Sequence, residues 1–162
     1  MSTSRPHPVL LLLLLAGACG GRVELELPPE GVPLFVVDTF PASGATVEPA
    51  HLSRISVTFD ADLGEDAPQN PKILDKIRLQ RRPAGEDAFD PNPVDLGLPG
   101  YHKPTHTLEF NTELGGVGEA ATAGVHFRLT IGKGLEAKAG RSLAADVHSL
   151  FWVGGEAPGA GN

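Results

Sequence analysis

The chain contains one cysteine, one tryptophan and one tyrosine in 162 residues, and each scarcity excludes something. A single cysteine excludes an intramolecular disulfide, so the paired core cysteines of antibody-type domains are absent. Packing must therefore hold the domain without a covalent cross-link. Aromatic residues form only 6% of the chain, fewer than a carbohydrate-binding platform normally shows.

An excess of basic residues is also missing. The 13 lysines and arginines face 20 aspartates and glutamates, which gives a formal net charge of −7. A protein that follows a phosphate backbone needs a basic face, so this balance argues against nucleic acid as a partner. The local pair Arg81 and Arg82 is followed by Pro83, a pattern that indicates the end of a strand.

Recognisable catalytic patterns are lacking. Ser53 or Ser149 could be imagined in a triad with a histidine and an aspartate, but no nucleophile-elbow motif surrounds either serine. His102 and His106 have the spacing of metal ligands on a helix, yet Pro104 between them blocks that helix. We therefore expect no enzymatic activity and no cofactor apart from a covalent lipid.

The dominant positive signal is alternation of apolar and polar residues. Ile55, Val57 and Phe59 would share one face of a strand, with Ser56 and Thr58 on the other. Residues 125–131 show the longest alternation, with every odd position apolar, so the register of that strand is well specified.

The sequence predicts an all-β sandwich of about seven strands over residues 34–154, followed by a disordered tail at 155–162. Twenty glycines and 15 prolines suit a loop-rich all-β domain, and no proline interrupts a predicted strand. Helix competes only near 72–76 and 119–122. The predicted strands are 34–38, 55–59, 77–81, 94–96 (brief), 107–110, 125–131 and 150–153.

The N-terminus has the pattern of a secretory signal: Arg5, an aliphatic run at 9–15, then small residues. The run is too short to span a membrane. Residues 15–19, Leu-Ala-Gly-Ala-Cys, resemble the lipobox of bacterial lipoproteins. The resemblance implies cleavage of residues 1–18 and acylation of Cys19. The alternative is an ordinary secreted protein with a free thiol.

If the lipobox functions, Cys19 carries a diacylglyceryl group and, in many bacteria, a third chain such as palmitate. Two or more acyl chains hold a protein stably on a membrane. Gly20 rather than aspartate follows the cysteine, which by the common sorting rule implies the outer membrane. Residues 19–33, rich in glycine and proline, are predicted to form the lipidated tether, although 23–27 could instead form a short edge strand.

The segment after the 55–59 strand is strongly acidic. Asp60, Asp62, Glu65 and Asp66 could offer oxygen ligands to Ca²⁺. Their spacing is not that of an EF-hand, because Gly64 occupies the third ligand position and no glutamate closes a twelve-residue loop. We therefore favour a solvated acidic turn over a metal site.

The whole pattern resembles the bacterial Ig-like domains of the type found in surface-layer proteins. Arg141 departs from the family, which usually has asparagine there. The resemblance implies a seven-strand Ig-like sandwich with a structural or adhesive role and no activity of its own. It rests on five motifs in the family's order, at 37–46, 55–63, 107–110, 123–131 and 134–143.

Two functions remain open from the sequence. The first is a membrane-anchored lipoprotein whose single Ig-like domain has a structural or protein-interaction role, with an unidentified envelope protein or glycan as partner. The second is a Ca²⁺- or glycan-binding module that uses the loops at 60–66 or 82–106.

Overall fold

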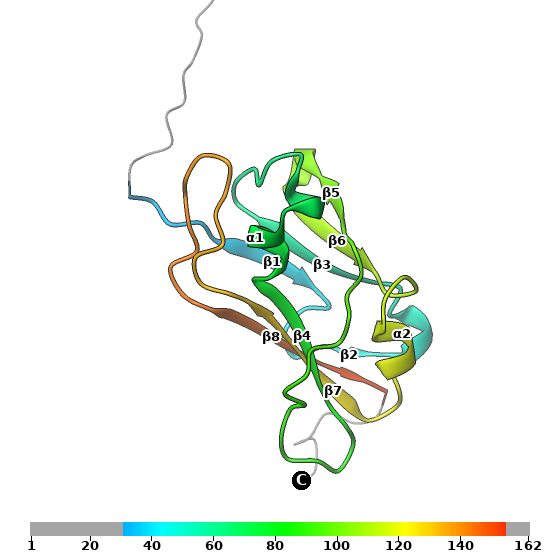
Figure 1. The fold of residues 1–162 in the computed structure, drawn as a ribbon. Coiled ribbons are helices and arrows are strands. Elements are labelled where there is room, and N and C mark those ends of the chain that lie inside the picture. The colour runs from blue at the N-terminus through cyan, green and yellow to red at the C-terminus, as the bar shows by residue number, and fades with distance from the viewer. Residues whose placement is uncertain (1–30, 155–162) are drawn as a thin grey trace, which may run out of the picture.

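The computed structural model describes residues 31–154, in which eight strands form two four-stranded sheets packed face to face (Figure 1). The strands are β1 (Val36–Phe40), β2 (Thr46–Val47), β3 (Arg54–Phe59), β4 (Ile77–Arg82), β5 (Gly100–His102), β6 (Thr107–Asn111), β7 (Val125–Ile131) and β8 (Val147–Val153). The helices are single turns: α1 (Pro71–Leu74), α2 (Val117–Ala120), η1 (Pro49–His51), η2 (Ala67–Gln69) and η3 (Lys103–Thr105). No helix within the described range is long and apolar enough to cross a membrane.

The strand order identifies the fold. One sheet has the order β1-β3-β6-β5, and the other has the order β2-β8-β7-β4. All neighbours are antiparallel except β2, which pairs in parallel with the end of β8. Apart from the two-residue β2, this is the arrangement of a seven-strand Ig domain, with the first, second, fifth and fourth strands in one sheet and the other three in the second. The protein is therefore an all-β Ig-like sandwich, as the sequence predicts.

The two strands with the clearest alternation occupy central positions. In β3, Ile55, Val57 and Phe59 are buried, while the residues between them are half-buried. In β7 all four odd positions are buried, and Phe127 stacks on Phe151 of β8 with ring centroids 5.3 Å apart. Side chains from both sheets thus fill one core, and the predicted registers of both strands are confirmed.

Several predicted boundaries are wrong because backbone pairing, rather than composition, sets them. The first strand starts at Val36, not Leu34, because the Leu34 N–H donates to the Ser142 carbonyl in the β7–β8 loop. Residues 94–96 are not a strand, since Val94 makes only an isolated bridge to Leu79 beside two prolines that lack an N–H.

The loop predicted at 82–106 is shorter in the structure. Arg82 ends β4, and β5 (Gly100–His102) pairs with β6, which leaves 83–99 as the irregular segment. This segment leaves the lower end of β4 and runs back along the sheets to β5 (green in Figure 1). A three-residue strand carries too little alternation to be detected from sequence.

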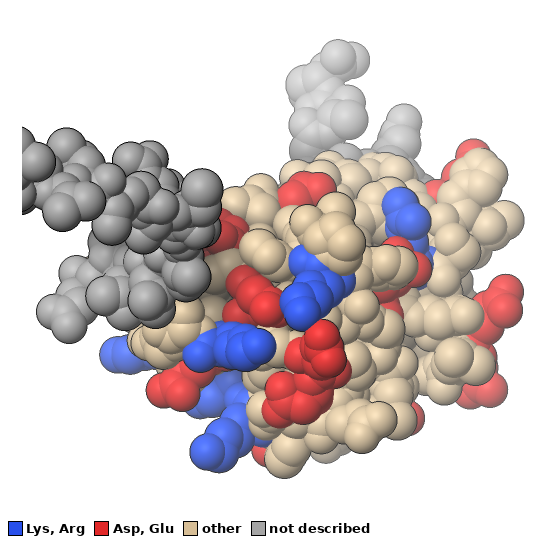
Figure 2. All heavy atoms as spheres, turned by 90° about the horizontal axis from the view of Figure 1, so that it is seen from above, with Lys and Arg blue, Asp and Glu red and all other residues tan. Residues whose placement is uncertain are grey.

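One end of the sandwich gathers the N-terminal segment and three loops. Residues 31–35, 60–76, 103–106 and 132–146 meet there, and we call this the loop end. Space-filling in Figure 2 shows basic and acidic side chains intermingled over the upper face, so neither sign forms a continuous patch in that view. The predicted signal peptide, Cys19, most of the tether and the predicted tail lie outside the described residues.

Candidate functional site

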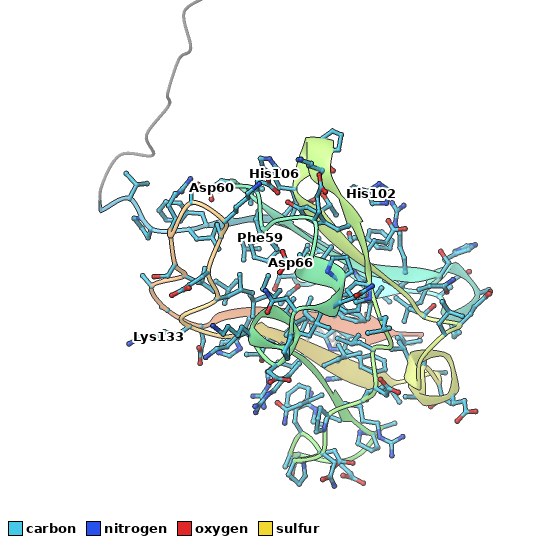
Figure 3. The ribbon with its side chains drawn as sticks, turned by 45° about the horizontal axis from the view of Figure 1, so that its top comes forward. Phe59, Asp60, Asp66, His102, His106 and Lys133 are labelled. Atoms are coloured by element: carbon cyan, nitrogen blue, oxygen red, sulfur yellow. The ribbon has the colours of Figure 1, made fainter. Side chains whose placement is uncertain are left out.

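The loop end contains the acidic segment that the sequence suggests as a Ca²⁺ site. It begins directly after β3, where Asp60 follows the buried Phe59 (Figure 3). Because β3 ends beside the start of β1 and the start of β6, segments distant in sequence surround these carboxylates.

Asp60 fastens the N-terminal segment to the loop end. Its Oδ1 accepts a hydrogen bond of 2.9 Å from the Phe35 N–H, and its Oδ2 accepts one from the Arg141 guanidinium. Arg141 also donates to the carbonyls of Val32 and Pro33, at 3.3 and 2.6 Å. Val32 and Pro33, which lie inside the predicted 19–33 tether, therefore contact the domain.

Asp62 has a different set of partners. Its Oδ1 accepts hydrogen bonds from the Gly64 N–H at 2.9 Å and from the Tyr101 hydroxyl at 2.7 Å. The Tyr101 oxygen in turn accepts a 2.9 Å bond from the Leu63 N–H. Gly64 has φ +97°, and a Cβ there would lie 2.8 Å from Asp66 Oδ1, so the tight turn favours glycine.

These contacts shift the acidities at the loop end. Burial raises the pKa of Asp60, but the bonds from Phe35 and Arg141 outweigh it and hold that pKa below its usual range. The bonds from Gly64 and then Tyr101 lower the pKa of Asp62. Burial, and the bond to Asp62, raise the pKa of Tyr101 to about 12. Because both aspartate pKa values are lowered on folding, these carboxylates stabilise the fold above about pH 3.9, and the contribution is lost as pH falls through the folded values.

The two remaining carboxylates point to further partners. Glu65 accepts a bond of 2.9 Å from Lys103 Nζ in η3, and both side chains are exposed. Asp66 accepts a bond of 3.0 Å from the Asn70 side chain. The four carboxylates thus share no donor with one another, and Asp60 and Asp66 lie apart at the loop end (Figure 3). Within residues 31–154 no three histidine, cysteine or acidic side chains gather as metal ligands would. An acidic turn without a metal stays our prediction.

We predict no change in melting temperature between millimolar Ca²⁺ and EDTA. Calcium at a hundred times its dissociation constant would stabilise the fold by about 2.7 kcal/mol, a shift of several degrees for a domain of this size. Thermal unfolding of the purified protein measures this. A clear rise with Ca²⁺ that Asp60→Asn combined with Asp62→Asn abolishes would establish the metal site instead.

We predict that Arg141→Gln lowers the free energy of unfolding by about 1–3 kcal/mol. The Arg141 side chain is only 15% exposed and donates to three oxygens, so its loss leaves polar groups without partners. Urea unfolding measures the change. The control is Lys103→Gln at the same end, which removes an exposed ion pair and should change little. Equal effects of the two variants would mean that Arg141 does not fasten the N-terminal segment.

The structure also places several of the other candidates from the sequence. Ser149 is buried and bonds to Thr39, with oxygens 3.1 Å apart, rather than to a histidine. His102 and His106 lie on opposite sides of the turn that contains η3 (Figure 3). Tyr101 and Trp152 stand on different sheets, so they make no common platform for a sugar.

His126 points outward as predicted, but it is not a solvated histidine. Its Nδ1 accepts a hydrogen bond of 3.1 Å from Trp152 Nε1 and also contacts the Arg82 guanidinium. Burial and the nearby Arg82 charge lower the pKa of His126. The ring is therefore a neutral member of a packed outer surface.

Sequence reasoning missed Tyr101 and Arg141 as organisers of the loop end. The only indication for Arg141 in the sequence was that the family it resembles usually has asparagine at this position. Tyr101 lies on a strand too short to recognise, and its partner Asp62 is 39 residues away. Such long-range pairs leave no local pattern.

The chain is similar to solved structures at low sequence identity. No protein-family model and no curated protein matches the chain. Two solved structures of Escherichia coli alpha-2-macroglobulin are similar at 14% identity over 78% of this chain. They are a crystal structure spanning domains MG0-NIE-MG1 (TM-score 0.44, 33% of that chain) and a cryo-EM reconstruction of the native conformation (TM-score 0.47, 6% of that chain). The chain thus spans a third or less of these proteins, and the Ig-like assignment rests on the strand order.

Proposed function

We propose that this protein is a lipid-anchored Ig-like module of the bacterial cell envelope with a structural or protein-interaction role. The lipobox-like stretch that ends at Cys19 supports the anchor, and the Ig-like sandwich supports a binding or scaffolding role. By the sorting rule, Gly20 directs the protein to the outer membrane.

The observation that carries the proposal is the place where the chain joins the domain. Arg141 and the Leu34–Ser142 hydrogen bond fasten residues 32–34 at the loop end. Gly31 lies twelve positions after Cys19, and such a stretch reaches at most about 40 Å. Attachment at this end should keep the loop end nearer the membrane on average than the opposite end, which would then be directed toward a partner.

The opposite end has features that suit contact with a partner. Leu98 and Leu114 are 68% and 73% exposed, and a Cβ on Gly97 would lie 3.2 Å from the Leu114 carbonyl oxygen. Two exposed leucines thus stand on adjoining turns. Isolated exposed apolar residues are common, so the pair supports the orientation without identifying the partner.

Density-gradient separation of the two membranes tests the location, and outer-membrane recovery is the expected result. For orientation, Ala139→Cys at the loop end and Leu114→Cys at the opposite end each introduce a thiol for a fluorescent donor. Energy transfer to an acceptor in the lipid head groups should be stronger from position 139. Equal transfer would contradict the orientation, and recovery in the soluble fraction would contradict the anchor.

A further inference from the structure

The outer face of the sheet made by β4, β7 and β8 collects cationic side chains. The register places Gln80 opposite Arg128, Arg78 opposite Thr130 and Thr130 opposite His148. These residues alternate with the buried positions of their strands, so they lie on the face away from the core.

These arginines lack acidic partners. The ion pairs found among residues 31–154 involve neither Arg78 nor Arg128, nor Arg82 beside them. In the 83–99 segment Asp90 pairs with Arg81 and accepts a hydrogen bond from the Asn92 N–H. Asp75 and Asp95 line the adjoining cleft with Arg78 but form no ion pair with it. In a chain with a net charge of −7, arginines that form no ion pair within residues 31–154 require an explanation.

A pocket of about 250 Å³ opens at this place, and we call it the arginine pocket. Residues 90–94 run beside β4, held by bonds from Asp90 N–H to the Arg81 carbonyl and from Val94 N–H to the Leu79 carbonyl. Two prolines of this segment thereby form one wall. The lining residues are Arg78, Gln80, Pro91, Pro93, Arg128, Thr130 and His148.

Arg128 is held in position before any ligand binds. Its Nη2 donates to Gln80 Oε1 at 2.7 Å, and its guanidinium carbon lies 4.4 Å from the centroid of the Phe89 ring. Its Nε is buried and has no hydrogen-bond partner within the described residues. A desolvated cationic donor without an acceptor costs free energy, so this group is poised to gain from a negative charge nearby.

We propose that the arginine pocket binds an oxyanion group of a ligand, either a carboxylate or a phosphate. Planar guanidinium groups suit both oxyanions, and charge-assisted hydrogen bonds are about twice as strong as neutral ones. His148 Nδ1 is 3.0 Å from the Thr130 hydroxyl, so its other ring nitrogen is left for a ligand. The proposal does not depend on the lipid anchor.

The size of the pocket limits what enters it. Sites for drug-sized ligands occupy roughly 300–1,000 Å³, so 250 Å³ suits one anionic group or one sugar ring. A larger cleft of about 700 Å³ shares Arg78 and Pro93 with it. Apolar side chains such as Leu96 and Phe110 line part of this cleft, and Asp75 and Asp95 line another part. A ligand that extends beyond its anionic group has room there.

Titration with inorganic phosphate, D-glucuronate and neutral D-glucose tests the proposal, with NMR chemical shifts of the purified full-length protein as the readout. Phosphate or glucuronate should shift signals of Arg78, Arg128 and His148, and glucose should not. Arg78→Gln and Arg128→Gln should each weaken binding by about tenfold or more. Arg54→Gln, which makes the same change of charge on the other sheet, should leave the affinity within about twofold.

The outcomes separate the sources of the anion. Stronger binding of glucuronate assigns the pocket to acidic saccharides, and stronger binding of phosphate assigns it to phosphorylated groups. Because the Arg78 side chain is exposed, Arg78→Gln should fold. If Arg128→Gln fails to fold, the affinity of Arg78→Gln tests the proposal by itself. Equal binding of glucose, equal weakening by Arg54→Gln, or no shift at concentrations well above millimolar would overturn the proposal.

Discussion

Phe127→Ala should lower the free energy of unfolding by about 3–5 kcal/mol, most of the margin of a typical domain. Phe127 is fully buried on the central strand β7 and stacks on Phe151, so truncation leaves a cavity between the sheets. Phe59→Ala, on the central strand of the opposite sheet, should have a similar effect. Urea unfolding followed by circular dichroism measures both, and the spectrum of the native protein should be dominated by β structure.

Ser56→Ala is the control for this prediction. Ser56 lies between buried residues of β3 but faces away from the core and is only half-buried. Its loss should change stability little. Equal and small effects of all three substitutions would show that the packing of the two sheets is not as described, and a helix-dominated spectrum would show the same.

Cys19→Ala should move the protein from the membrane fraction to the soluble fraction. Without the thiol no diacylglyceryl group can be attached, and each buried methylene removed costs about 0.8 kcal/mol of membrane affinity. Fractionation of cells that express either form measures the change. Metabolic labelling with a fatty acid should mark the wild-type protein alone.

A carbonate wash supplies the control, because it strips proteins that adhere only through their surface. The wild type should resist the wash, whereas any residual membrane-bound Cys19→Ala should be removed. If the variant fractionates and resists the wash like the wild type, the lipobox interpretation is wrong and another segment holds the protein on the membrane.

The sequence by itself determined the class of the fold and one central strand in each sheet, β3 and β7. Alternation is a local property with a period of two, so Ile55, Val57 and Phe59 could be assigned to one face without knowledge of their partners. The same reasoning placed Phe127 in the core and Arg128 outside it. A long, uninterrupted alternation leaves few registers that bury its apolar face. For this reason the predicted bounds of β7, 125–131, agree with the observed ones.

Only the tertiary structure decided which side chains meet. Asp60 and Arg141 are 81 residues apart, and Asp62 and Tyr101 are 39 apart, so no local pattern indicates either contact. The four clustered carboxylates look equivalent in the sequence. In the structure each accepts hydrogen bonds from its own donors, because loops from both sheets converge at one end. Alternation likewise placed Arg78 and Arg128 outside the core, but the β4–β7 register and the backbone bonds of residues 90–94 are what bring them into one pocket.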